Sequence, residues 1–173
     1  MVELEPYNAA WPAEFRREAQ RVADAVGEAV EAIEHIGSTA VPTLVAKPII
    51  DLAAKTAADV DPFELSEPLA SLGYRQHTAG PKTHAVYVRA DGDRRTHILH
   101  VFTPDQWAHC NQRLFRDKLL RDADARRRYE SLKMRLAASD ASNYTAGKSP
   151  LVQELLNEER ASRGLPPVTA WDK

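Results

Sequence analysis

The stretch "EHIGSTAVPTLVAKPIID", residues 34–51, constrains the fold more than any other part of the chain. A short strand-like segment around residues 33–36 ends at Gly37, and a compact apolar run begins at Pro48. Glycine allows the backbone to turn sharply out of a strand, and proline is tolerated at a strand's first position. We therefore expect one strand just before Gly37 and a second over residues 48–54, with Asp51 inside the second.

Hydrophobic spacing predicts further helices and strands in the rest of the chain. Apolar residues that recur every three or four positions indicate amphipathic helices, and β-rich runs on both sides of an Asp-Gly turn indicate a hairpin. In chain order we expect helices over 11–33 and 62–74, hairpin strands over 83–89 and 94–102, and helices over 104–122, 124–139 and 149–163. This order predicts an α/β (α+β) fold, with a mixed β-sheet backed by helices and a helical C-terminal part.

The size and composition of the chain are those of one globular domain. The chain has 173 residues, of which 43% are hydrophobic and 28% are charged. This length and composition suffice for a single hydrophobic core. We expect one domain over residues 1–165, followed by a C-terminal tail over residues 166–173.

Charge and cysteine content limit the classes of partner. The net charge is −2, and no basic stripe interleaved with aromatic residues is present, which argues against a nucleic-acid partner. A membrane span needs ~20 consecutive apolar residues, and the sequence has no such run. The single cysteine, Cys110, cannot form an intramolecular disulfide, so we expect a cytoplasmic protein.

The residue types around Gly37 suit a phosphate group. A glycine at a strand exit lets the backbone approach a ligand closely, and Ser38 and Thr39 add hydroxyls and backbone N–H groups. Asp51, in the next strand, would hold Mg²⁺, which prefers oxygen ligands, while Lys47 would offset phosphate charge. The alternative is ordinary turn chemistry, since glycine, serine and proline are common in loops.

The spacing of these residues resembles a known signature. Gly37-Ser38, twelve further residues and then Asp51 after two isoleucines resemble the signature of the polymerase-β-like nucleotidyltransferase superfamily. The fuller string "EHIGSTAVPTLVAKPIIDL" resembles the GrpB family within it, also known as UPF0157-type. The later strings "RTHILHVF", "FRDKLLRD", "YESLKMRLA" and "YTAGKSPLV" extend the resemblance to roughly residues 5–160.

The resemblance implies a metal-dependent enzyme. It would transfer a nucleotidyl or phosphoryl group from a nucleoside triphosphate to a small acceptor, with Mg²⁺ or Mn²⁺ as cofactor. Gly37, Ser38 and Thr39 would bind the nucleotide together with basic residues of the helical half, which are Arg116, Lys133 and Lys148. Asp51, His100 and Lys47 would form the catalytic set.

The sequence departs from the superfamily pattern at one position. The second carboxylate of the metal pair should fall at position 53, where this chain has Ala53. His100, on the second hairpin strand, is the best candidate to compensate as a metal ligand, and His35 is a further candidate. Each could instead be a buried histidine with a structural hydrogen bond.

Ala53 therefore leaves two main hypotheses open. The first is the transferase, and the second is a non-catalytic nucleotide- or ligand-binding module with a degenerate metal site. A histidine-metal hydrolase that uses His35, His97 or His100 is a third, weaker hypothesis, because the sequence contains no "HExxH" or similar signature.

Overall fold

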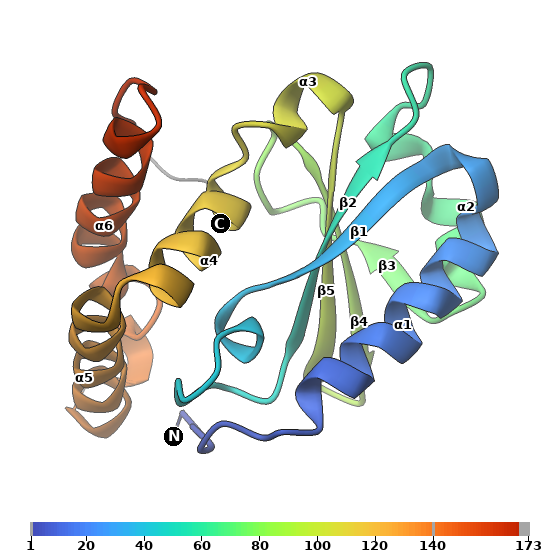
Figure 1. The fold of residues 1–173 in the computed structure, drawn as a ribbon. Helices are drawn as coiled ribbons and strands as arrows, with labels where there is room; N and C mark the ends of the chain where they lie inside the picture. The colour runs from blue at the N-terminus through green and yellow to red at the C-terminus, as the bar shows by residue number, and fades with distance from the viewer. Residues whose placement is uncertain (1, 140, 170–173) are drawn as a thin grey trace.

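The computed structural model describes residues 2–139 and 141–169, and it shows a five-stranded sheet flanked by helices (Figure 1). The strands are β1 Val30–Ile36, β2 Ile50–Thr56, β3 Tyr74–Gln76, β4 Ala85–Asp91 and β5 Arg94–Phe102. The α-helices are α1 Trp11–Val26, α2 Ser66–Ala70, α3 Pro104–Trp107, α4 Asn111–Arg121, α5 Ala123–Ser139 and α6 Ser149–Ser162. Short 3-10 turns η1 to η5 lie at Gly27–Ala29, Ser38–Ala40, Pro62–Glu64, Ala141–Asn143 and Ala146–Lys148. The helices and strands predicted from spacing are thus present in the predicted order.

The sheet is mixed, as the sequence predicts. Its strand order is β1-β2-β5-β4-β3, and only the β2–β5 pair is parallel. In this register Asp51 lies opposite Ile36 on one side and Ile98 on the other. Ala53 lies opposite His100. Because side chains alternate along a strand, Asp51, Ala53, Ile98 and His100 share one face of the sheet.

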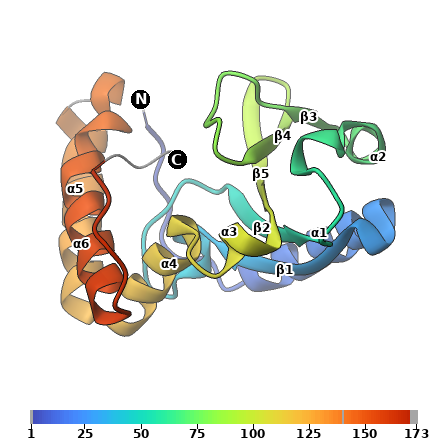
Figure 2. The same ribbon diagram turned by 90° about the horizontal axis from the view of Figure 1, so that it is seen from above.

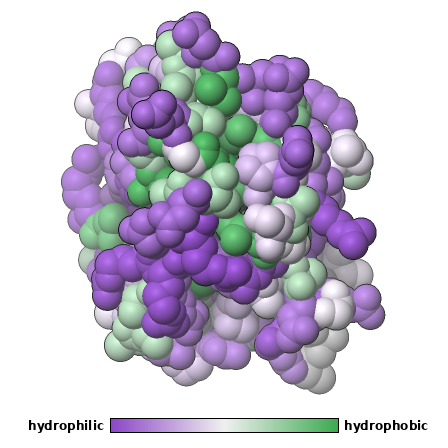
Figure 3. Space-filling view, turned by 90° about the vertical axis from the view of Figure 1, so that its right-hand side faces the viewer, coloured by the Kyte–Doolittle hydropathy of each residue, from purple (hydrophilic) through white to green (hydrophobic). Residues whose placement is uncertain are grey.

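Helix α1 covers the opposite face of the sheet. Trp11 and Val22 pack with Leu52, Leu99 and other strand residues in the main core. The side of the molecule with α1 and α2 presents mostly hydrophilic residues, with apolar ones between them (Figure 3). Helix α1 therefore buries the apolar residues on its own face of the sheet, and the candidate site lies on the opposite face.

Helices α4, α5 and α6 form a bundle beside the sheet (Figure 2). A second core joins them, and it includes Val41 and Leu44 from the loop between β1 and β2. Both loop residues are fully buried. The loop that follows Gly37 is therefore anchored in the helical half of the molecule.

Three element boundaries differ from the prediction. The helix predicted over 11–33 ends at Val26, and β1 begins at Val30. The apolar residues near this boundary fit both the helical period and the two-residue period of a strand, so their spacing does not separate the two elements. The helix predicted over 104–122 breaks into α3 and α4 around Cys110, which has an extended backbone. The helix predicted over 62–74 is shorter, and β3 follows it as an edge strand that spacing did not predict.

The last described residues are held against the helical half. The side chain of Asn157 exchanges two hydrogen bonds with the backbone of Val168, with N–O distances of 2.8 and 3.0 Å. Residues 170–173 of the predicted tail lie outside the described residues. In the part of the chain that is described, no helix is long and apolar enough to cross a membrane.

Candidate functional site

Gly37 and Asp51 are in direct contact. The backbone of Gly37 has φ 73° and ψ −175°, a conformation that is essentially restricted to glycine. A Cβ atom placed on it would lie 2.2 Å from Oδ2 of Asp51. The glycine that ends β1 is thus required for two reasons, which are the backbone turn and the carboxylate packed against it.

A cavity of about 440 Å³ opens beside this contact. Ser38, Asp51 and His100 line it, together with Ile98 and Val86 of the sheet. Four cationic side chains also line it: Lys47, Arg95, Lys133 and Lys148. Asp51 is the one acidic residue among the lining residues, so the cavity favours an anionic ligand.

The lysines of the helical half are buried and oriented. Lys133 is only 2% exposed, and its ammonium donates hydrogen bonds to Oγ of Ser38, at 2.9 Å, and to the carbonyl of Val45. The ammonium of Lys148 lies 4.2 Å from the ring centroid of Tyr144, and that of Lys47 lies 4.6 Å from it. Tyr144 is itself buried and lines the cavity. One aromatic ring therefore positions two of the cations.

His100 is hydrogen-bonded to a second histidine. Its Nδ1 lies 2.9 Å from Nε2 of His84, and both side chains are buried. The His84 ring stacks on Phe102, with ring centroids 4.5 Å apart. No local spacing predicts this pairing, because the two histidines lie sixteen positions apart, His84 in a loop and His100 on β5.

His35 and His97 lie on the other face of the sheet. His35 pairs with Leu52 in the register, so it faces α1, where its ring stacks on Phe15 at 4.7 Å. Burial, together with the nearby Arg116 guanidinium, lowers the pKa of His35 to about 4. His97 is 4.0 Å from Glu18 on the same side. The structure therefore brings neither histidine to Asp51.

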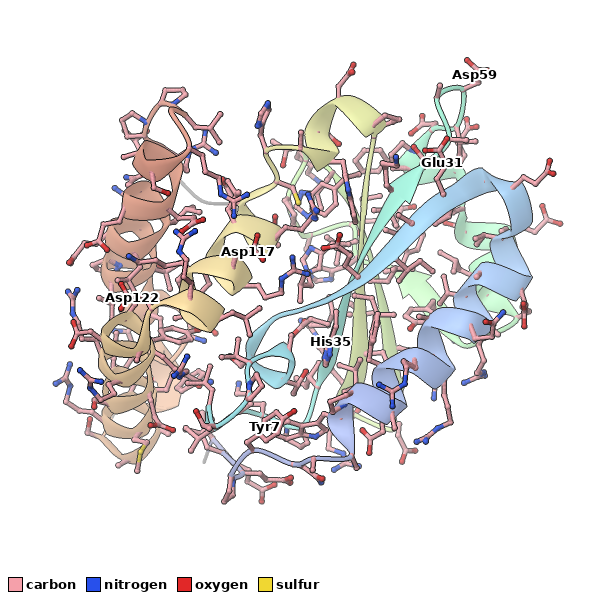
Figure 4. All side chains as sticks on the ribbon, viewed as in Figure 1. Tyr7, Glu31, His35, Asp59, Asp117 and Asp122 are labelled. Atoms are coloured by element: carbon pink, nitrogen blue, oxygen red, sulfur yellow. The ribbon has the colours of Figure 1, made fainter. Side chains whose placement is uncertain are left out.

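Thr39 and Arg116 are committed to the protein itself. The Thr39 hydroxyl donates to the carbonyl of Ile49, so Nε2 of His35 donates to the Thr39 oxygen at 2.9 Å. Arg116 donates to Glu34, to Asp117 and to the carbonyl of His35. Figure 4 shows His35 on β1 and Asp117 on α4, the two elements that Arg116 joins. Both residues thus support the site's framework.

The donor set at Asp51 is small. Ala53 has no exposed surface and packs with Ile36, Phe102 and Cys110, so its position belongs to a core. Among the described residues, no cluster of three or more His, Cys, Asp or Glu side chains could hold a metal. Mg²⁺ commonly binds one or two carboxylates and takes its other ligands from water and substrate phosphates. Asp51 fits a cation held in that way, and it does not fit a site made of protein ligands alone.

The architecture is a mixed α/β domain, in which a five-stranded sheet lies beside a helical C-terminal part, as the sequence predicts. The chain belongs to the GrpB family: the family model described as GrpB protein matches residues 1–158. A UPF0157 protein of Pseudomonas aeruginosa is 36% identical over 174 residues, which cover 96% of this chain and 71% of that protein.

A solved structure of another GrpB protein agrees with this assignment. The conserved protein GrpB from Enterococcus faecalis superposes with a TM-score of 0.80 at 25% identity, over 94% of this chain and 99% of that one. A more distant likeness is to the RNA terminal uridylyl transferase Cid1, with a TM-score of 0.48 and 13% identity over 73% of this chain and 40% of that one. The family and fold predicted from the sequence are confirmed.

Proposed function

We propose that the cavity beside Gly37 binds a phosphorylated small molecule, for which a nucleoside triphosphate is the first candidate. One observation carries this proposal: four cationic side chains converge on a cavity that has a single carboxylate. Two of them, Lys133 and Lys148, are buried, so their charges are held at fixed positions beside the cavity. A phosphate chain would supply several acceptor oxygens to Lys47, Lys133 and Lys148 at once.

The test is a calorimetric titration of pyrophosphate and of nucleoside triphosphates into the wild type and two lysine variants. Hydrogen bonds to charged groups contribute roughly 1.5–3 kcal/mol. Lys148→Met should therefore weaken binding by about 10- to 100-fold. Lys55→Met is the matched control, because Lys55 lies on the same strand as Asp51 but pairs with Glu31 at 2.9 Å, outside the cavity. Equal affinities in all three proteins would refute the proposal.

Metal-dependent transfer of a nucleotidyl or phosphoryl group to a small acceptor is the second candidate function. The packing of Asp51 against Gly37, at the cavity and next to the strand of His100, favours it. Asp51, with His100, would hold Mg²⁺ or Mn²⁺, which would neutralise phosphate charge as the transfer proceeds. Lys47, Lys133 and Lys148 would orient the phosphates and stabilise the same charge. Ala53, which is buried where a second metal-binding carboxylate is expected, instead favours a protein that binds the ligand without transferring a group.

Turnover separates these two functions. The wild type is incubated with nucleoside triphosphates, Mg²⁺ or Mn²⁺ and a panel of small alcohols and amines, and product is followed by mass spectrometry. Asp51→Asn should abolish any product, because an amide is a much poorer ligand for these cations. A wild type that binds triphosphate tightly but forms no product would leave the binding module as the function.

A further inference from the structure

A second, smaller cavity adjoins the cationic one. It has a volume of about 70 Å³ and lies between the end of β1 and helices α4 and α5. Its apolar walls come from Ile36, Phe115, Leu119 and Tyr129, and the polar side chains of Gln112 and Arg116 line it as well. The rings of Phe115 and Tyr129 meet edge to face, with centroids 5.2 Å apart, which fixes one wall.

The two cavities meet at three polar side chains. Ser38, Asp51 and His100 line both of them. A ligand that fills both would therefore have its anionic end among the lysines and an apolar end among these walls. The junction between the two ends would lie at Ser38 and Asp51, next to Gly37.

The size of the smaller cavity limits what it can hold. A buried water molecule needs roughly 10–15 Å³ of cavity volume, and a cavity of about 150 Å³ holds a benzene molecule. A volume of 70 Å³ is thus several times that of a water site but about half that of a site for an aromatic ring. A short aliphatic chain matches it.

We infer that the ligand that fills the whole site is a phosphate ester of a short aliphatic alcohol, with its alkyl group between Leu119 and Tyr129. This inference rests on the proposed phosphate site, and it replaces the nucleoside by a short alkyl group as the group that the phosphate carries. The phosphate end is held by charge, and the alkyl end is selected by the removal of apolar surface from water.

The experiment is a calorimetric series of n-alkyl diphosphates from methyl to decyl, with methyl diphosphate as the reference of equal charge. Burial of one methylene contributes about 0.8 kcal/mol, which is about fourfold in affinity. Affinity should rise by up to about fourfold per carbon over the first short members and then reach a plateau, when the subsite is full. A series that is flat from methyl onward would overturn the inference while leaving the phosphate site intact. If no member binds at all, the proposed phosphate site fails as well.

Variants of the wall give the control. Leu119→Phe should fill the subsite and flatten the series, with methyl diphosphate bound as in the wild type. Leu120→Phe makes the same change on the next residue of α4, which is 45% exposed and outside both cavities, so it should keep the full series. Phe115→Leu should widen the subsite and move the plateau to longer chains, a shift that loss of stability cannot produce. An unchanged plateau in Phe115→Leu, or a full series in a folded Leu119→Phe, would refute the location of the subsite.

Discussion

Gly37 has no side chain at the point where the carboxylate of Asp51 reaches the backbone. The two residues are fourteen positions apart in the sequence, yet any Cβ on Gly37 would overlap the carboxylate. The contact links the end of β1 to the middle of β2. Gly37 and Asp51 therefore form one structural unit, although they are distant in the sequence.

The first prediction concerns this contact. Gly37→Ala should lower the free energy of unfolding by more than about 2 kcal/mol. The backbone conformation of Gly37 costs ~1–3 kcal/mol when another residue adopts it, and the added methyl group also displaces Asp51. Urea unfolding at neutral pH measures the loss. In the double variant Gly37→Ala with Asp51→Ala, the overlap with the carboxylate should be relieved, while the backbone part and the 2.8 Å approach to the Cβ of residue 51 should remain. A double variant no more stable than Gly37→Ala would show that Asp51 is not the obstacle.

The second prediction concerns pH and His35. Its pKa falls from 6.5 in the unfolded chain to about 4 in the fold, so between these values the unfolded chain binds the proton more tightly. The contribution of neutral His35 to the free energy of unfolding is fully present above pH 6.5 and is lost as the pH falls toward 4. From pH 7 to pH 5 we expect it to contribute a loss of about 2 kcal/mol.

His35→Gln isolates this contribution. Glutamine can still donate to Thr39 but does not titrate, so the variant should lose about 2 kcal/mol less than the wild type between pH 7 and pH 5. Glu18 and Glu34 also have lowered pKa values, but their contributions to the pH dependence are the same in both proteins and cancel in the comparison. Parallel pH profiles for the two proteins would contradict the buried, neutral His35.

At the scale of elements, helix α4 is tied to strand β1 by charge. Arg113 and Arg116 donate three hydrogen bonds to the carboxylate of Glu34, at 2.8 to 3.0 Å. Burial alone would raise the pKa of Glu34, but the bonds from Arg113 and Arg116 hold it below its usual value. This junction sets the position of α4, whose Phe115 and Leu119 line the smaller cavity.

The third prediction tests whether Arg116 belongs to this junction or to the ligand site, as expected from the resemblance. Because its guanidinium already bonds Glu34 and Asp117, Arg116→Met should lower stability by roughly 1–3 kcal/mol. Pyrophosphate affinity should stay within about threefold of the wild type, a difference of under 1 kcal/mol. Thermal unfolding and calorimetry on the same preparation give both values. A tenfold loss of affinity with unchanged stability would return Arg116 to the phosphate site.

At the scale of the whole molecule, the sheet and the helical half share one loop. Residues 37–49 place Ser38 and Lys47 at the cavity and bury Val41 and Leu44 among the helices. Lys133 of α5 bonds back to Ser38 at 2.9 Å. The site therefore exists only when both halves are docked.

The fourth prediction is that the chain unfolds as one cooperative unit. Far-UV circular dichroism and tryptophan fluorescence should give coincident urea curves, as expected for one domain over residues 1–165. Leu44→Ala should cost about 2–5 kcal/mol, shift both curves together and weaken pyrophosphate binding. Met134→Ala, at a residue that is 56% exposed, should change stability by less than about 0.5 kcal/mol. Two separated transitions would indicate independent halves.

The sequence by itself determined the order of most elements and the hairpin, and it singled out Gly37, Ser38 and Asp51, which the structure brings together. These rest on local periodicity, turn chemistry and one short signature, all of which act over a few residues. It also named Lys47, Lys133 and Lys148, which line the cavity. Their roles in binding remain predictions.

Only the tertiary structure decided which face each residue takes and what it meets there. A shift of one position along a strand moves a side chain to the other face, and so His35 faces α1 while Asp51 faces the cavity. The partnership of His84 with His100 joins a loop to a strand, and the smaller cavity forms only where α4 docks against β1. Such contacts depend on how elements that are distant in the sequence pack together, and local sequence patterns do not predict that packing.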